Sequence, residues 1–178
     1  PCPLLEEGDT VRDDSPAYPP PQGGGRGRSS LVTNKEMSSL ATNATPTNLV
    51  CKVVYFPSCI NQTMGLAKKS PEEMPLVNKM VSLLHKAGYE VIFPQNMDKL
   101  CCGTIWESKG MMDIADKKSI ELEAALYEAS EQGKYPVLCD QSPCLYRMRH
   151  TINKIQLYEP VEFIHTFLAD KLEFAQTN

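Results

Sequence analysis

The hydrophobic pattern changes abruptly near Asn48, and this change divides the chain into two parts. After that position, short apolar runs alternate with amphipathic stretches. Before it, proline and glycine triplets stand among scattered Ser, Thr and Asn, with neither a helical nor a strand period. Such a segment buries too little apolar surface to offset the entropy of ordering it. We therefore predict a disordered tail or linker over residues 1–48 and a folded domain over residues 49–178.

Four short apolar runs in the second part predict β-strands. They are rich in Val, Ile, Tyr and Phe, and Pro57 and Pro94 directly follow the first two runs. Runs of this length and composition, bounded by proline, are typical of buried strands. The predicted strands cover Leu49 to Phe56, Tyr89 to Phe93, Val137 with Leu138, and Ile155 to Tyr158.

Amphipathic stretches between these runs predict helices. The first is expected to begin at Ser70, because a serine N-cap, Pro71 and Glu73 form a capping signature, and to end near Gly88. Later helices are predicted over Met111 to Ala129, Leu145 to about Ile152, and Pro160 to Leu172. The apolar face of the helix that begins at Met111 is expected to consist of Ile114, Ile120, Leu122 and Leu126.

The alternation of strands and helices predicts the fold class. A strand–helix order repeated in this way is typical of α/β proteins, in which helices cross over between parallel strands and cover the faces of the sheet. We therefore expect a Rossmann-like parallel sheet of about four strands with flanking helices, preceded by the disordered tail.

Composition and charge exclude two classes of function. The chain has 178 residues, of which 42% are hydrophobic and 22% charged, and its net charge is -4. Without a strong positive field, a nucleic-acid partner is disfavoured. The longest apolar runs are far shorter than the roughly 20 residues needed to cross a bilayer, so no transmembrane segment is expected.

Seven cysteines are the one compositional anomaly. Their odd number, one adjacent pair and the lack of a signal-peptide pattern argue against a secreted disulfide framework. They favour metal or redox use in a reducing compartment, and we expect a cytoplasmic protein. Cys2 lies in the predicted tail, and Cys51 begins a strand, where packing in the core is expected.

The other five cysteines follow the predicted strands. Ligands of open α/β sheets bind at the carboxyl ends of the strands, and the cysteines fall in the loops there. Thiolates in such numbers suit zinc or an iron–sulfur centre. Cys139 also ends an apolar run, so both a ligand and a core position stay open for it. The candidate metal ligands are Cys59, Cys101, Cys102, Cys139 and Cys144.

The adjacent pair needs a turn. Neighbouring side chains on an extended strand point to opposite faces, so Cys101 and Cys102 can serve one small site only where the backbone turns, as Gly103 permits, or where two metal atoms are bridged. The backbone N–H groups of Gly103 and Thr104 are candidate donors to a bound group.

Three motifs carry a resemblance to a known family. They are Tyr55-Phe56-Pro57-Ser58-Cys59, Cys101-Cys102-Gly103 and Ser142-Pro143-Cys144. In this order they resemble the cysteine-rich CCG domain found in heterodisulfide reductases and in the iron–sulfur subunit of glycolate oxidase, over residues 51–174. The segments 140–144 and 157–163 are most similar to the C-terminal part of FAD-linked iron–sulfur D-lactate dehydrogenases.

The resemblance implies a redox function. It implies that Cys59, Cys101, Cys102 and Cys144 bind an iron–sulfur cluster, of which the 4Fe-4S type is one form. It also implies that electrons pass from a flavin to a quinone or cytochrome. No dinucleotide-binding region is found in this chain, so the FAD is expected on another domain or subunit, and this chain alone should not oxidise lactate. A quinone acceptor would place the protein at the surface of the inner membrane.

One departure from the family pattern leaves alternatives open. The last family motif is usually Cys-x-x-Cys, and this chain has Gln141 where the first cysteine would stand. A structural zinc site in a docking module and a fragment that has lost its function are the alternatives.

The sequence also predicts where the other side chains near the cysteine motifs lie. Arg147, Arg149 and His150 are expected on a solvated helix face, with contact to an anionic partner or to a charged cluster as the alternative. Trp106 and Lys109 follow the Cys-Cys-Gly turn and are expected to border the site and limit its access to solvent. For Trp106, a purely structural role in packing is the alternative. The adjacent Met111 and Met112 are expected to fill the core.

Overall fold

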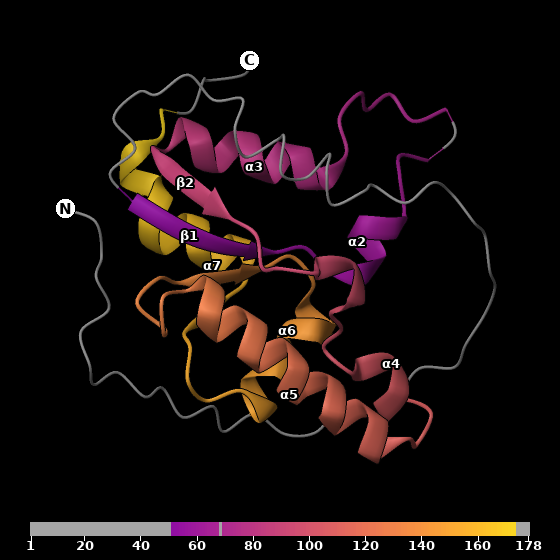
Figure 1. The fold of residues 1–178 in the computed structure, drawn as a ribbon. Coiled ribbons are helices and arrows are strands. Elements are labelled where there is room, and N and C mark those ends of the chain that lie inside the picture. Colours follow the sequence, from indigo (N-terminus) through magenta and orange to yellow (C-terminus); the bar gives the residue numbers. More distant parts are fainter. Residues whose placement is uncertain (1–50, 68, 174–178) are drawn as a thin grey trace.

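A four-stranded parallel sheet lies at the centre of the molecule. The structure, a computed structural model, describes residues 51–67 and 69–173 (Figure 1). Its strands lie in the order β2-β1-β3-β4, and each neighbouring pair is parallel. The predicted α/β class is confirmed. The predicted tail, Cys2 and the first two residues of the first predicted strand lie outside the described residues. The strands are β1 (Cys51–Phe56), β2 (Tyr89–Ile92), β3 (Val137–Cys139) and β4 (Leu157–Tyr158).

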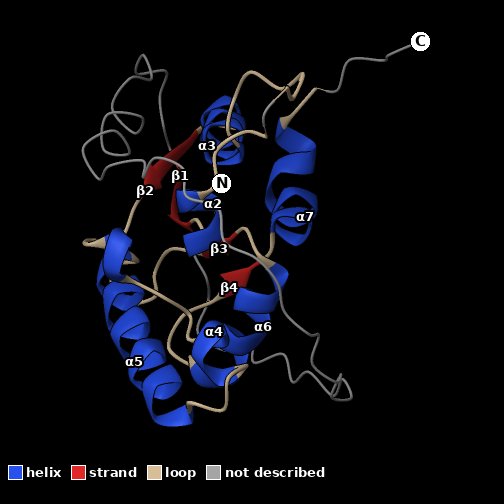
Figure 2. Ribbon diagram, turned by 90° about the vertical axis from the view of Figure 1, so that its right-hand side faces the viewer, coloured by secondary structure: helices blue, strands red, loops and turns tan. Residues whose placement is uncertain are grey.

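Helices cover both faces of this sheet. Helices α3 (Leu76–Lys86) and α7 (Pro160–Phe163) lie on one face, and α5 (Met112–Ala129) and α6 (Ser142–Thr151) lie on the other (Figure 2). Beyond α7 the chain continues as a π-helical turn, Ile164–Leu168, and a 3-10 turn, Ala169–Lys171. Among the residues that the structure describes, every helix is too short or too polar to cross a membrane.

Strand order places a switch point between β1 and β3. The chain leaves β1 toward β2 on one side, and then returns past β1 to β3 on the other. In such sheets the connections diverge at this point, and the carboxyl ends of the two strands border a natural binding position.

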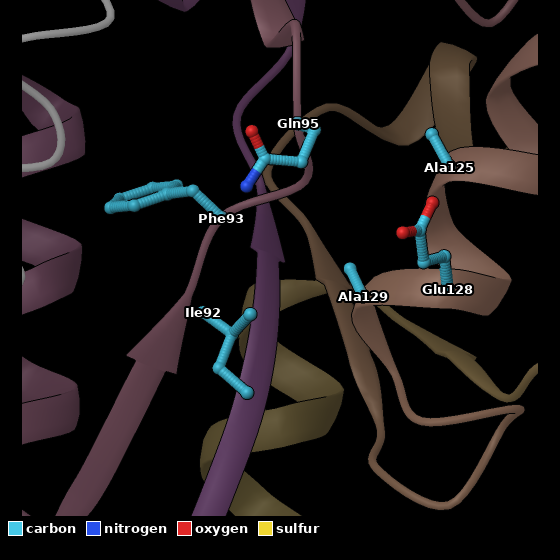
Figure 3. A pocket seen from close by; sticks show the side chains of 6 residues that line it. All are labelled: Ile92, Phe93, Gln95, Ala125, Glu128 and Ala129. Carbon is cyan, nitrogen blue, oxygen red and sulfur yellow. The ribbon is translucent and has the colours of Figure 1, made fainter.

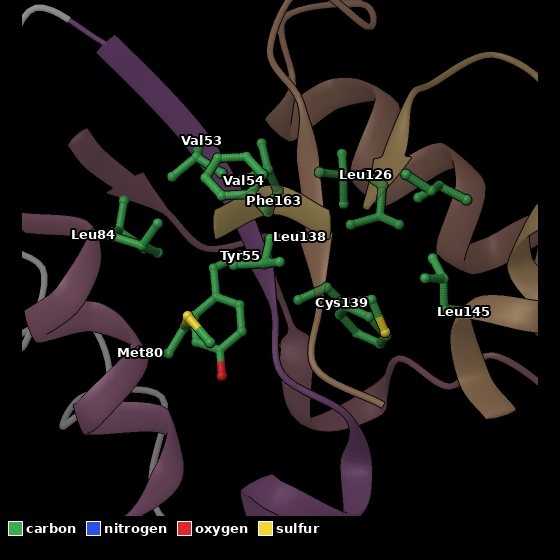
Figure 4. Close-up of a cluster of buried hydrophobic side chains, with 14 of the residues drawn as sticks. Val53, Val54, Tyr55, Met80, Leu84, Leu126, Leu138, Cys139, Leu145 and Phe163 are labelled. Atoms are coloured by element: carbon green, nitrogen blue, oxygen red, sulfur yellow. The ribbon is translucent and has the colours of Figure 1, made fainter. Parts of the chain in front are cut away.

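The core is apolar on both sides of β1. Val53, Val54 and Tyr55 are all 0% exposed, as expected for a central strand of a parallel sheet. Figure 4 shows Leu84 of α3 and Leu126 of α5 on opposite sides of this strand. Burial of these side chains on both faces is the main apolar contribution to the stability of the fold.

The first predicted helix begins later than expected. Helix α3 starts at Leu76 with Pro75 as its N-cap, and the prediction of a start at Ser70 is wrong. The Ser70 hydroxyl accepts a hydrogen bond from the Glu72 N–H at 3.1 Å, which makes a local turn instead. Pro75 explains the difference, because a proline inside a helix lacks the N–H needed for the i to i−4 hydrogen bond.

The buried face of α5 also differs from the prediction. Leu122 and Leu126 are buried as expected, but Ile120 is 67% exposed, and Ala115 and Ser119 occupy the buried stripe instead. Small residues at these positions let the neighbouring chain approach α5 closely. Met111 and Met112, expected in the core, are exposed. Ile114 is only half-buried.

The segments that carry the cysteines are more helical than predicted. Two short helices, α2 (Cys59–Thr63) and α4 (Thr104–Glu107), and the 3-10 turn Met97–Lys99 stand where loops were expected. Helix α6 begins at Ser142 instead of Leu145, and β4 is shorter than predicted at its start. Cys59 and Cys144 therefore lie in the first turns of helices, where the backbone is ordered.

Candidate metal centre

Four thiols meet at the carboxyl ends of the strands. Cys59 lies next to Cys101, Cys101 next to Cys102, and Cys102 next to Cys144, close enough for each thiol to affect the pKa of its neighbour. We call these four residues the thiol string. Three separate segments contribute to it, following β1, β2 and β3. The structure therefore brings together the four cysteines that were predicted to share one site, and their role as ligands stays a prediction.

The start of α2 places Cys59. Cys59 is the first residue of this helix, and Ser58 is the N-cap, whose hydroxyl accepts a hydrogen bond from the Asn61 N–H at 3.4 Å. A serine in this position satisfies one of the free N–H groups of the first turn. Because β1 ends only at Phe56, the cap fixes Cys59 directly above the end of the central strand.

A turn at Gly103 brings the adjacent cysteines to one site. Gly103 has φ of +90°, and a Cβ at this position would lie 2.5 Å from the Ala115 carbonyl oxygen. Only glycine adopts such a conformation without strain and without that overlap. The Gly103 N–H donates to the Sγ of Cys101 at 3.4 Å, and the Sγ of Cys102 lies 3.2 Å from the Oγ1 of Thr104. The turn predicted from Gly103 is therefore present.

Hydrogen bonds within the string separate the pKa values of its members. The thiols of Cys101 and Cys144 donate to Cys102 and lower its pKa well below the ordinary value, and the Thr104 backbone N–H adds to this effect. The neighbouring Cys101 thiol also lowers the pKa of Cys59, to about 7. The pKa values of Cys101 and Cys144 are raised, chiefly because their protons are held by Cys102. The string thus favours a thiolate, which is the form of cysteine that binds metals.

The solvent exposure of the cysteines increases from one end of the thiol string to the other. Cys102 and Cys144 are buried, Cys101 is half-buried and Cys59 is exposed. One end of the string therefore faces solvent, and the other lies against the core. A group bound here would be most accessible to a partner on the Cys59 side.

Cys139 lies in the core beside the string. It is 0% exposed, and its Sγ lies 3.8 Å from the Gln141 carbonyl oxygen. Burial raises the pKa of its thiol to about 12. Figure 4 shows it among the core side chains. Sequence analysis left a ligand position and a core position open for Cys139. The structure shows it in the core, at the buried end of β3.

Arg147 is buried, contrary to the prediction of a solvated face. It is 4% exposed, and its guanidinium lies 2.6 Å from Glu107 and 2.8 Å from Asp116. Its Nε donates to the Cys102 carbonyl oxygen at 3.0 Å. The preferred solvated position of Arg147 is therefore wrong, and its place one helical turn after Cys144 puts the two residues on the same face of α6.

Other residues predicted near the site lie at its margin. Arg149 and His150 are exposed, as expected. Arg149 pairs with Glu162 at 2.5 Å. Trp106 is half-buried on α4, and Lys109 is exposed.

The structure also has a cavity that is not lined by any of the four thiols. It has a volume of about 220 Å³ and lies between the end of β2 and α5 (Figure 3). The side chains that line it belong to Ile92, Phe93, Gln95, Ala125, Glu128 and Ala129. None of them is a candidate metal ligand, so the thiol string is the better candidate for a functional site.

The kind of donor, although not a closed arrangement around one ion, suits a thiolate-bound metal group. Four sulfurs from three segments, with two backbone N–H groups directed at them, are the ligands that zinc and iron–sulfur centres use. Within residues 51–67 and 69–173, no three His, Cys, Asp or Glu side chains surround one point as a single ion requires. The thiols form a string instead.

Comparisons with protein-family models, with curated proteins and with solved structures found no match to this chain.

Proposed function

We propose that residues 49–178 form an iron–sulfur electron-transfer domain. It would relay electrons in a flavin-dependent dehydrogenase of D-lactate or another 2-hydroxy acid, with a quinone or cytochrome as the acceptor. The observation that carries the proposal is the thiol string, in which three segments distant in sequence bring four thiols side by side. The choice of enzyme class rests on the resemblance of the three cysteine motifs to the CCG domain.

Each part of the string has a defined task in this proposal. Cys59, Cys101, Cys102 and Cys144 would hold the cluster, which takes up and releases single electrons. The N–H groups of Gly103 and Thr104 donate to sulfur, and such donors stabilise negative charge there and tune the reduction potential. Buried Cys102 and Cys144 keep water from one side.

The exposed end of the string defines where partners approach. Cys59 lies at the surface, so an electron donor or acceptor would reach the site from the side of α2. The proposed donor is a flavin on a separate domain or subunit. A quinone acceptor would make the protein a peripheral one on the cytoplasmic side of the inner membrane.

Metal analysis tests the proposal directly. The chain is purified without oxygen, and its iron, zinc and acid-labile sulfide are measured beside its visible and EPR spectra. We expect iron and sulfide in near-equal amounts and an EPR signal that changes on reduction. Zinc alone, with no redox signal, would replace the proposal with a structural zinc module that docks onto a partner. A chain without either metal would refute both.

A further inference from the structure

One of the three cysteine segments contacts both of the others. The segment 140–147 runs from the end of β3 into α6 and carries Cys144. A charged side chain stands near each end of it, Asp140 and Arg147. Each of the two makes hydrogen bonds to a different thiol-bearing turn.

Asp140 holds the turn that carries Cys59. Its Oδ1 accepts a hydrogen bond from the Ser58 backbone N–H at 2.8 Å, and its Oδ2 accepts one from the Tyr55 hydroxyl at 2.8 Å. Ser58 and Tyr55 are both 0% exposed. Ser58 is also the N-cap of α2, so the carboxylate holds the backbone immediately before Cys59.

Arg147 holds the turn that carries Cys101 and Cys102. Its Nε donates to the Cys102 carbonyl oxygen at 3.0 Å, and the hydroxyl of Ser119 donates to the same oxygen at 3.1 Å. Ser119 and Arg147 are each 4% exposed and come from different helices. One buried carbonyl is thus held by two side chains.

The charge of Arg147 is balanced by carboxylates on two other helices. Glu107 lies at the end of α4 and Asp116 in the first turns of α5. A buried guanidinium is costly unless it is paired and hydrogen-bonded, and here it is both. The arrangement links α4, α5 and α6 around the Cys101–Cys102 turn.

We infer that Asp140 and Arg147 are positioning residues, which set the spacing of the thiol string by holding its two other segments against the one that carries Cys144. Asp140 places Cys59, and Arg147 with Ser119 places Cys101 and Cys102. The use of this spacing for a metal group rests on the proposed function, but the spacing itself is a property of the metal-free chain.

Thiol bridging measures the spacing without any metal. The reduced, metal-free full chain is treated with dibromobimane, whose two bromomethyl carbons are each attacked by a thiolate with loss of bromide. The reagent becomes fluorescent when both sites have reacted, and mass spectrometry of the digest identifies the bridged pair. Monobromobimane, which reacts with one thiol at a time, corrects for differences in exposure and acidity.

The variants separate the two positioning residues. We expect R147M to slow bridging of Cys102 with Cys144 by roughly fivefold to tenfold, the range for losing one or two hydrogen bonds. R147K should restore part of the rate. D140N should slow bridging of Cys59 with Cys101 and leave the Cys102–Cys144 pair unchanged. R149M is the matched control, because Arg149 is on the same helix but half-exposed and paired with Glu162.

Several outcomes would overturn the inference. One is wild-type bridging in a folded R147M chain, with folding checked by circular dichroism and thermal unfolding. Another is an equal loss for all pairs in both variants, which would indicate a general effect on the fold. If R147M does not fold, S119A is used instead, because it removes one of the two donors to the Cys102 carbonyl oxygen. An unchanged rate of bridging between Cys102 and Cys144 in S119A would refute the inference. Iron content of the wild-type chain is measured separately, so failure of the proposed function is recognised independently of the bridging result.

Discussion

The two ends of the sheet use cysteine in different ways. At the amino end, Cys51 begins β1 and is buried, with the Lys171 amine 3.7 Å from its sulfur and 3.1 Å from the Tyr89 hydroxyl. The surroundings are aromatic, since the rings of Tyr89 and Phe163 lie 5.7 Å apart. At the carboxyl end, four thiols contact one another. A single cysteine fills space in the core, whereas a string of cysteines supported by N–H donors favours a thiolate.

Gly88 and Gly103, one at each end, differ in how closely they are packed. Gly88 precedes β2 at the amino end and Gly103 follows the paired cysteines at the carboxyl end, and both have positive φ. Space for a side chain exists only at Gly88, where nothing lies within 4 Å of a Cβ position. The chain is therefore packed more tightly around Gly103 than around Gly88.

Removal of a thiol from the string should have the largest effect. We expect C102S to lose nearly all bound metal, because Cys102 contacts two other members of the string. C51S, at the other end of the sheet, should keep the wild-type metal content. Iron and zinc analysis of both variants, purified without oxygen, checks this expectation. Equal metal content in the two variants would contradict the prediction that only the cysteines at the carboxyl end of the sheet bind metal.

Substitution of the two glycines should sharpen the contrast in stability. G103A places an alanine in a left-handed backbone conformation and brings its Cβ too close to the Ala115 carbonyl oxygen. We expect a loss of about 3 to 4 kcal/mol in the free energy of unfolding. G88A has the conformational cost alone, about 1 to 2 kcal/mol. Denaturant unfolding of both variants measures the difference. Similar losses would show that the Gly103 turn is free to move away from α5.

The Tyr55 hydroxyl links the core to the carboxyl end. Y55F removes its hydrogen bond to Asp140, and we expect a loss of about 2 kcal/mol, the range for a hydrogen bond to a charged group. Y89F is the comparison at the amino end, where the hydroxyl meets an amine that is only partly buried, so a smaller loss is expected. Thermal or denaturant unfolding distinguishes them, and a larger loss for Y89F would contradict the expectation.

Cys139 should give the smallest effect. C139A removes a buried sulfur outside the thiol string, and we expect a loss of about 1 kcal/mol in stability with unchanged metal content. Metal analysis beside an unfolding curve checks both parts. A loss of metal would make Cys139 a fifth ligand and would extend the site into β3.

Some features of the site could be predicted because they depend on local sequence. The helix over Met112–Ala129 was predicted to within one residue at its start, since its apolar period continues over several turns. The order of cysteines after strands also indicated the correct edge of the sheet. The start of α3 was missed because Pro75 overrides an otherwise good capping signature farther upstream.

Other features depend on contacts between distant segments. Asp140 bonds to the backbone of a residue 82 positions earlier, and Arg147 to a carbonyl 45 positions earlier. Arg149, two residues later on the same helix, is exposed, whereas Arg147 is buried. Burial of one and exposure of the other follow from the packing of α6 against α4 and α5.

By itself the sequence determined the α/β class, the strands and the edge of the sheet at which the cysteines gather. Hydrophobic period is a local property of the chain, and helices between consecutive strands are typical of parallel crossovers. Only the tertiary structure decided which thiols touch, that Cys139 lies in the core, and that Asp140 and Arg147 hold the turns. Those outcomes depend on how closely separate elements pack, and the packing distance is set by side chains from the whole domain.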